Sequence, residues 1–69
     1  MASFQIIFKD VEENELSKEV VCMKGLCAAK RSAKATAPAN AYKIEITDLI
    51  GKELTRITLG QLSKWHDAI

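Results

Sequence analysis

The chain has 69 residues, of which 48% are hydrophobic and 28% are charged, and its formal net charge is +1. This composition is typical of a globular domain and excludes the disordered class, and no apolar stretch approaches the roughly 20 residues that span a bilayer. We therefore expect a single domain over residues 1–69. Such a small domain buries only about 60% of the surface that its unfolded chain exposes, so we expect marginal stability.

A strand is predicted at residues 3–9, where Phe4, Ile6 and Phe8 recur at period two in a run rich in aromatic and β-branched side chains. The acidic, polar residues 10–15 that follow are typical of a turn. The first element is therefore expected to be one arm of a hairpin.

The second arm is predicted at residues 18–23, with Val11 opposite Leu16 and apolar side chains on both faces of the hairpin. The alternative is a long first helix beginning near residue 17, which Gly25 and the neighbouring valines oppose. A hairpin that is apolar on two faces needs covering on both, by helices or by another subunit.

A helix is predicted from Gly25 to about Thr36, because this segment is rich in alanine and Pro38 prevents its continuation. At 100° per residue, the apolar side chains fall on one narrow stripe. The stripe consists of Leu26, Ala29, Ala33 and Ala37. Its small side chains should allow the helix to approach a sheet closely.

A second hairpin is predicted after residues 42–47, which alternate between apolar and polar side chains. Asp48 and Gly51 have the spacing of a three-residue hairpin loop with a left-handed glycine. Pairing Asp48 with Lys52 places the apolar residues of the strand at 42–47 on the same face as Leu54.

A terminal helix is predicted from about Leu59 onwards, because Thr58 and Gln61 have the spacing of a capping box. Leu62, Trp65, His66 and Ile69 would form its buried face. The expected fold is thus α+β, a small antiparallel sheet in the order β-β-α-β-β-α. The longer first helix gives the alternative order β-α-β-β-α.

Few residue types that carry chemistry occur in this chain. His66 is the single histidine, and no serine, cysteine or carboxylate can be placed beside it as a catalytic partner. Cys22 and Cys27 are interpreted as reduced, structural thiols, and with one histidine they supply too few ligands for a zinc site. We therefore expect no enzyme activity, metal or cofactor.

Charge is strongly segregated along the chain. Residues 1–19 are acidic, whereas residues 20–43 contain five cations and no acid. Such a patch can bind nucleic acid or can simply be a solvated surface. The candidate residues for a nucleic-acid interface are Lys24, Lys30, Arg31, Lys34 and Lys43.

The sequence favours a non-catalytic protein-binding or homo-oligomerising module, whose partner is itself or another small protein. Marginal size and a hairpin that is apolar on two faces support this hypothesis. The candidate interface residues are Ile7, Leu16, Val20, Leu49 and Ile50. The alternative is a nucleic-acid-binding accessory protein that uses the basic helix. The first residues lack a secretory signal pattern, which predicts a cytoplasmic location without membrane contact.

Overall fold

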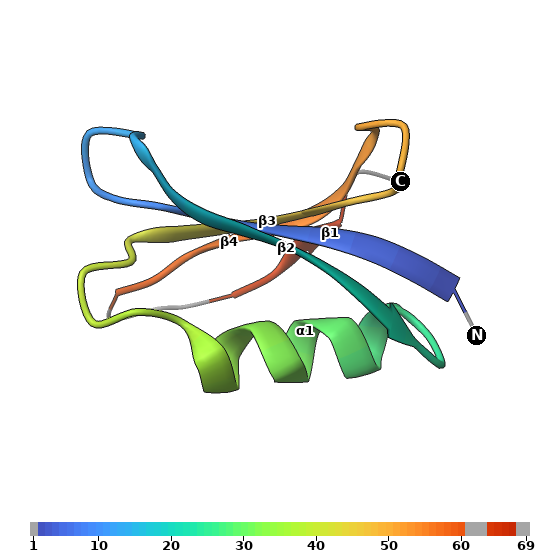
Figure 1. Ribbon diagram of the computed structural model, residues 1–69. Coiled ribbons are helices and arrows are strands. Elements are labelled where there is room, and N and C mark those ends of the chain that lie inside the picture. The colour runs from blue at the N-terminus through green and yellow to red at the C-terminus, as the bar shows by residue number, and fades with distance from the viewer. Residues whose placement is uncertain (1, 61–63, 68–69) are drawn as a thin grey trace.

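The computed structural model describes residues 2–60 and 64–67. Its elements are β1 (Ala2–Lys9), β2 (Glu15–Met23), α1 (Leu26–Thr36), β3 (Lys43–Thr47), β4 (Glu53–Thr58) and β5 (His66–Asp67). The strands form one antiparallel sheet in the order β2-β1-β3-β4-β5, and α1 lies across one of its faces (Figure 1). In the part of the chain described, no helix is both long and apolar enough to cross a membrane.

The core lies between α1 and the sheet. Ala29 and Ala33 of the helix are fully buried, as the predicted stripe requires, and their small side chains let the helix sit directly on the strands. The sheet contributes the large side chains of the core. These are Phe4, Ile6, Phe8, Ile44, Ile46 and Ile57. Apolar burial of this kind contributes roughly 25 cal/mol per Å².

The first hairpin is confirmed, so the alternative with a longer first helix is wrong. Its register differs from the expected one, because Phe4 lies opposite Val21 and not opposite Met23. Because the shift is of two residues, the side chains of both strands stay on their predicted faces, with one exception. The exception is Leu16, an extra residue at a bulge in β2, which packs against the core.

The turn of this hairpin is built around Asp10. One of its carboxylate oxygens accepts hydrogen bonds from the backbone N–H groups of Glu12 and Asn14, both at 2.9 Å. Glu13 adopts the left-handed conformation, with φ of 64°. The carboxylate of Asp10 therefore fixes a tight acidic loop that protrudes from the sheet.

The second hairpin is confirmed, and its loop has the predicted form. Gly51 has φ of 92°, and its N–H donates to the carbonyl of Asp48. A bulge between Ile46 and Thr47 then shifts the pairing by one residue, so that Thr55 and Ile57 face the core. The regular register that was predicted is therefore wrong beyond Ile46, whereas Leu54, the extra residue at the bulge, is half-buried and packs against the core.

The predicted terminal helix is not found in the described residues. Thr58 ends β4, and His66–Asp67 pairs with β4 as a fifth strand. Gln61, Leu62 and Ile69, which the helix prediction used, lie outside the described residues. A helix of about ten residues that contains Gly60 is marginal by itself. Pairing with the edge of β4 prevails over that local preference.

Candidate protein-binding surface

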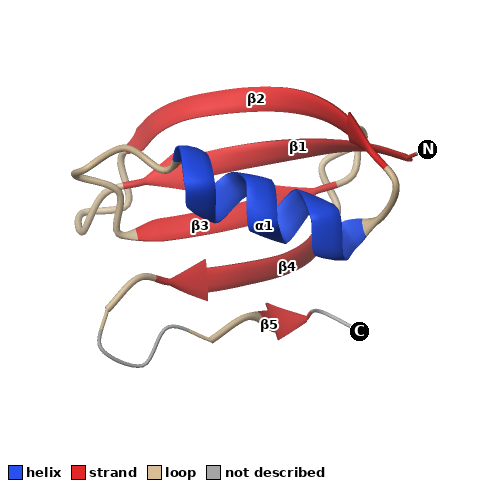
Figure 2. Ribbon diagram, turned by 90° about the horizontal axis from the view of Figure 1, so that it is seen from below, coloured by secondary structure: helices blue, strands red, loops and turns tan. Residues whose placement is uncertain are grey.

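The outer strand β2 forms one edge of the sheet. It is nine residues long, and β1 is the single described strand beside it. Most of its side chains are exposed, and Val20 is 66% exposed. Figure 2 shows α1 lying over the inner strands, with β2 beyond it. The free edge of β2 is therefore open along its length.

The hydrogen bonds of β1 show which backbone groups of β2 point outward. The carbonyl of Lys9 accepts from the N–H of Tyr42 at 2.7 Å, so Lys9 directs its backbone groups toward β3. Successive residues of a strand direct these groups to alternate sides, so β2 is bonded by Phe4, Ile6 and Phe8. Their partners in β2 are Val21, Glu19 and Ser17. The residues whose N–H and C=O groups point away from β1 are therefore Lys18, Val20 and Cys22.

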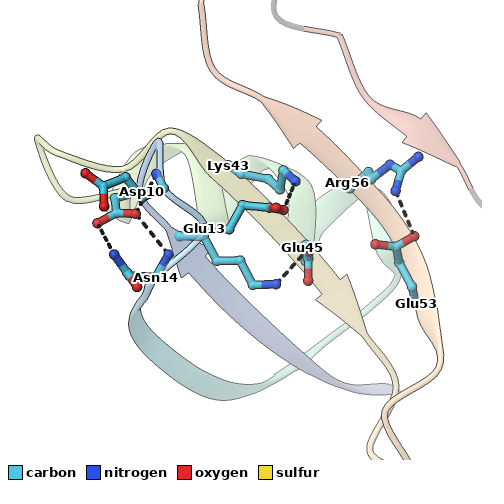
Figure 3. Close-up of polar contacts among 9 residues, drawn as sticks. Asp10, Glu13, Asn14, Lys43, Glu45, Glu53 and Arg56 are labelled. Carbon is cyan, nitrogen blue, oxygen red and sulfur yellow. Dashed lines mark hydrogen bonds and ion pairs between the residues drawn. The ribbon is translucent and has the colours of Figure 1, made fainter.

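The face of the sheet opposite α1, called here the open face, carries charged side chains. One row of register partners crosses all five strands: Lys18, Ile7, Glu45, Arg56 and His66. Ion pairs join Lys9 to Glu45 at 3.3 Å and Lys43 to Glu13 at 2.6 Å (Figure 3). These contacts neutralise much of the charge on this face, so it has the character of a solvated surface.

Electrostatics reinforce the acidic hairpin loop. The hydrogen bond from the ammonium of Lys43 lowers the pKa of Glu13, and the same contact raises the pKa of Lys43. Hydrogen bonding from the backbone N–H of Asn14 lowers the pKa of Asp10 (Figure 3). Both carboxylates are therefore held in the ionised form, and both serve the loop itself.

The opposite edge of the sheet is closed by the chain's own β5. The ammonium of Lys30 lies 2.9 Å from a carboxylate oxygen of Asp67 and 5.7 Å from the centroid of the Trp65 ring. The buried hydroxyl of Thr55 donates to the same carboxylate oxygen at 2.8 Å. The contact with Lys30, followed by that with Thr55, lowers the pKa of Asp67. We call these four residues the β5 clamp.

The predicted basic residues are divided by the sheet. Lys43 pairs with Glu13 on the open face, and Lys30 belongs to the β5 clamp. The three remaining cations, Lys24, Arg31 and Lys34, are exposed on or near α1 and form no ion pair with another described residue. The role of Lys30 depends on a contact with a residue 37 positions away, which no local sequence pattern reveals.

The predicted apolar interface residues also occupy separate places. Val20 is on the free edge, Ile7 is half-buried on the open face, and Leu16 packs against the core. Leu49 and Ile50 form the turn between β3 and β4, and Ile50 is 87% exposed. Sequence reasoning selected Val20 but missed its neighbours Lys18 and Cys22, because strand order across the sheet decides which strand has a free edge.

The imidazole and the two thiols lie on three different elements. Cys22 is on β2 at one edge of the sheet, His66 is on β5 at the other edge, and Cys27 is on α1. Both thiols are exposed and free, so the expectation that they pack in the core is wrong. Each falls on the outer side of its element, since the core is filled by larger apolar side chains and by Ala29 and Ala33.

Over residues 2–60 and 64–67 the structure encloses no pocket, and no group of three or more potential ligands could hold a metal ion. Comparisons with protein-family models, with curated proteins and with solved structures found no significant match.

Proposed function

We propose that this chain is a non-catalytic module that binds another protein chain by strand addition to the free edge of β2. The observation that carries the proposal is the outward backbone of Lys18, Val20 and Cys22, which meets no strand in the described part of the chain. Such an edge is a template for a further strand, in which backbone hydrogen bonds supply affinity. The exposed side chain of Val20 adds an apolar contact at the middle of the edge.

The separation of the reactive side chains supports a role in binding. Nucleophilic or general-base catalysis needs a thiol or hydroxyl within hydrogen-bonding distance of its base. Here His66 and Cys22 are on opposite edges of the sheet. We place the module in the cytoplasm, where exposed thiols such as Cys22 and Cys27 stay reduced.

A capture experiment tests the proposal with a matched pair of variants. Val20→Pro removes one outward N–H from the edge without removing a bond to β1, whereas Val20→Thr keeps that N–H and the branched shape. Tagged wild-type protein and both variants are incubated with nuclease-treated extract of the native host. We expect the wild type and Val20→Thr to retain the same protein, and Val20→Pro to lose it; the untagged chain itself counts as such a protein.

Equal capture by Val20→Pro and Val20→Thr would contradict strand addition at β2. Circular dichroism of both variants checks that each is folded. If nuclease treatment releases everything that the wild type retains, the protein-binding proposal fails as well.

A second candidate function is nucleic-acid binding by the helix side of the molecule. It is favoured by Lys24, Arg31 and Lys34, which pair with no described acidic residue. Binding to phosphates should weaken steeply with salt, because each neutralised phosphate releases counterions. Gel shifts at low salt should therefore show a complex that the triple alanine variant of these residues loses, and its persistence in that variant would exclude the helix as the interface.

A further inference from the structure

We infer that the strand added to β2 comes from a second copy of this chain, so that two β2 strands pair antiparallel about a two-fold axis at Val20. The inference rests on the proposed function and names its partner. The sheet would then continue from one copy into the other, with both α1 helices on the same side. Among the described residues, Figure 2 shows no helix or strand beyond β2 that would obstruct this approach.

Symmetry restricts which residues can lie opposite each other. An antiparallel pair formed at a sheet edge has its two-fold axis perpendicular to the sheet, so each face continues as the same face. Hydrogen-bonded pairs must therefore join outward-pointing residues of both copies. These residues are Lys18, Val20 and Cys22, all of which also direct their side chains to the open face.

Charge then selects one register. Placing Lys18 opposite Val20 of the copy brings the two Glu19 side chains face to face, and placing Lys18 opposite itself brings two ammonium groups together. Like charges directly opposite each other are destabilising. Placing Val20 opposite itself puts Lys18 opposite Cys22 and Glu19 opposite Val21, so no like charges lie directly opposite each other. Moving the axis on to Val21 would oppose Lys18 with Lys24 and shorten the pairing.

The register centred on Val20 also gives hydrogen-bond partners to the outward-pointing backbone groups of Lys18, Val20 and Cys22. Each pair of outward-pointing residues exchanges two hydrogen bonds, which gives about six bonds between the copies. The two Val20 side chains, each 66% exposed in the single chain, become cross-strand neighbours on the open face. The charges of Lys18 and Glu19 disfavour the other registers, because they would repel their own copies there, but they do not disfavour this one.

The oligomeric state is tested by sedimentation velocity over a range of protein concentrations under reducing conditions. We expect a concentration-dependent dimer for the wild type and for Val20→Thr. In Val20→Pro the dimer should weaken by about tenfold or more, because symmetry removes two donors at once. A monomer mass for the wild type at its highest soluble concentration, or an unchanged dimer in Val20→Pro, would overturn the inference.

A cross-linking experiment tests the register and does not depend on the folding of the proline variant. In the proposed pair Lys18 lies opposite Cys22 of the copy, and Cα atoms in a hydrogen-bonded pair are about 5.5 Å apart, a distance that suits a disulfide. Lys18→Cys treated with oxidised glutathione should therefore form a covalent dimer. The two positions within one strand are about 13 Å apart, too far for a bond inside the chain.

Two matched variants identify the bond. Lys18→Cys combined with Cys22→Ser should lose the covalent dimer, whereas Lys18→Cys combined with Cys27→Ser should keep it. The wild type should form little covalent dimer, because its two Cys22 residues do not face each other in this register. A dimer in solution without the bond between positions 18 and 22 would overturn the register.

The failure of this inference is distinguishable from failure of the proposed function. A monomeric wild type that still captures a different protein through β2, with loss in Val20→Pro and retention in Val20→Thr, refutes the second copy as partner and leaves strand addition standing. A dimer that is equally stable in Val20→Pro, together with equal capture by Val20→Pro and Val20→Thr, refutes both.

Discussion

The two edges of the sheet differ in how they end. At β4 the chain adds its own strand, β5, and the β5 clamp connects that strand to α1 and to the buried Thr55. At β2 the nine-residue outer strand has outward backbone groups and an exposed Val20, with no described strand beyond it. The same sheet thus closes one edge by a specific polar contact and leaves the longer edge available to another chain.

The largest effect is expected from removing the aromatic part of the β5 clamp. Trp65 is half-buried, packs against the core and lies beneath the ammonium of Lys30. Trp65→Ala should lower the free energy of unfolding by about 2 kcal/mol, less than the roughly 3–5 kcal/mol typical of a fully buried tryptophan. Urea denaturation at low protein concentration measures this loss.

The matched control for Trp65→Ala is Val20→Ala on the other edge. Val20 is largely exposed in the single chain, so its truncation should change the free energy of unfolding by less than about 0.5 kcal/mol. Equal losses in the two variants would contradict the distinction between a closed edge and an open one.

A smaller effect is expected from the buried hydroxyl of the clamp. Thr55→Val keeps the shape of a fully buried side chain but removes the donor to Asp67. The free energy of unfolding should fall by about 1 kcal/mol, the usual net value of a hydrogen bond. Thr58→Val, on an exposed residue of the same strand, should change it little. A larger loss in Thr58→Val than in Thr55→Val would show that the clamp does not hold β5.

The smallest effect depends on pH. The contacts with Lys30 and Thr55 hold the pKa of Asp67 below its ordinary value of about 3.9, so its ionised form stabilises the fold. For a lowered pKa this contribution is fully present above the ordinary value and is lost as pH falls through the folded value. Thermal midpoints measured between about pH 7 and pH 2 should therefore fall further for the wild type than for Asp67→Asn.

The control for this titration is the acidic hairpin loop. Asp10 and Glu13 also have lowered pKa values, so Asp67→Asn should still lose stability in acid. The difference between the two proteins isolates Asp67. If that difference stays constant down to about pH 2, Asp67 does not contribute through its charge.

Period-two and alanine-rich patterns predicted the first four strands and the helix, because these signals are local. Strand register was not predictable to the same degree. A single bulge, in which Leu54 is the extra residue, brought Thr55 and Ile57 to the core, and nothing in the local sequence marks that extra residue. Of the candidate interface, Val20 could be found from the sequence because it is an apolar residue on the second face of the first hairpin, but the free edge itself depends on strand order.

The segment after β4 shows why a local signal can mislead. Thr58 and Gln61 have capping-box spacing, but Thr58 ends a strand, and the residue before it, Ile57, is fully buried in the core. Trp65 was expected to dock on the core, and it does pack there, although it does so just before a strand. The contact between Lys30 and Asp67 joins residues 37 positions apart, so it follows from the tertiary fold alone.

The pairing of β1 with β3 has a consequence for how the molecule assembles. β1 is the first strand of the chain but lies inside the sheet, between its hairpin partner β2 and β3, which follows the helix. Each hairpin can form from nearby residues, whereas joining them closes a loop that includes all of α1. Before β3 pairs with β1, Ile6 and Phe8 have no contact with their partners Ile46 and Ile44. The two hairpins therefore reach their final stability together, and the β1–β3 junction makes one cooperative unit of a chain whose elements are otherwise local.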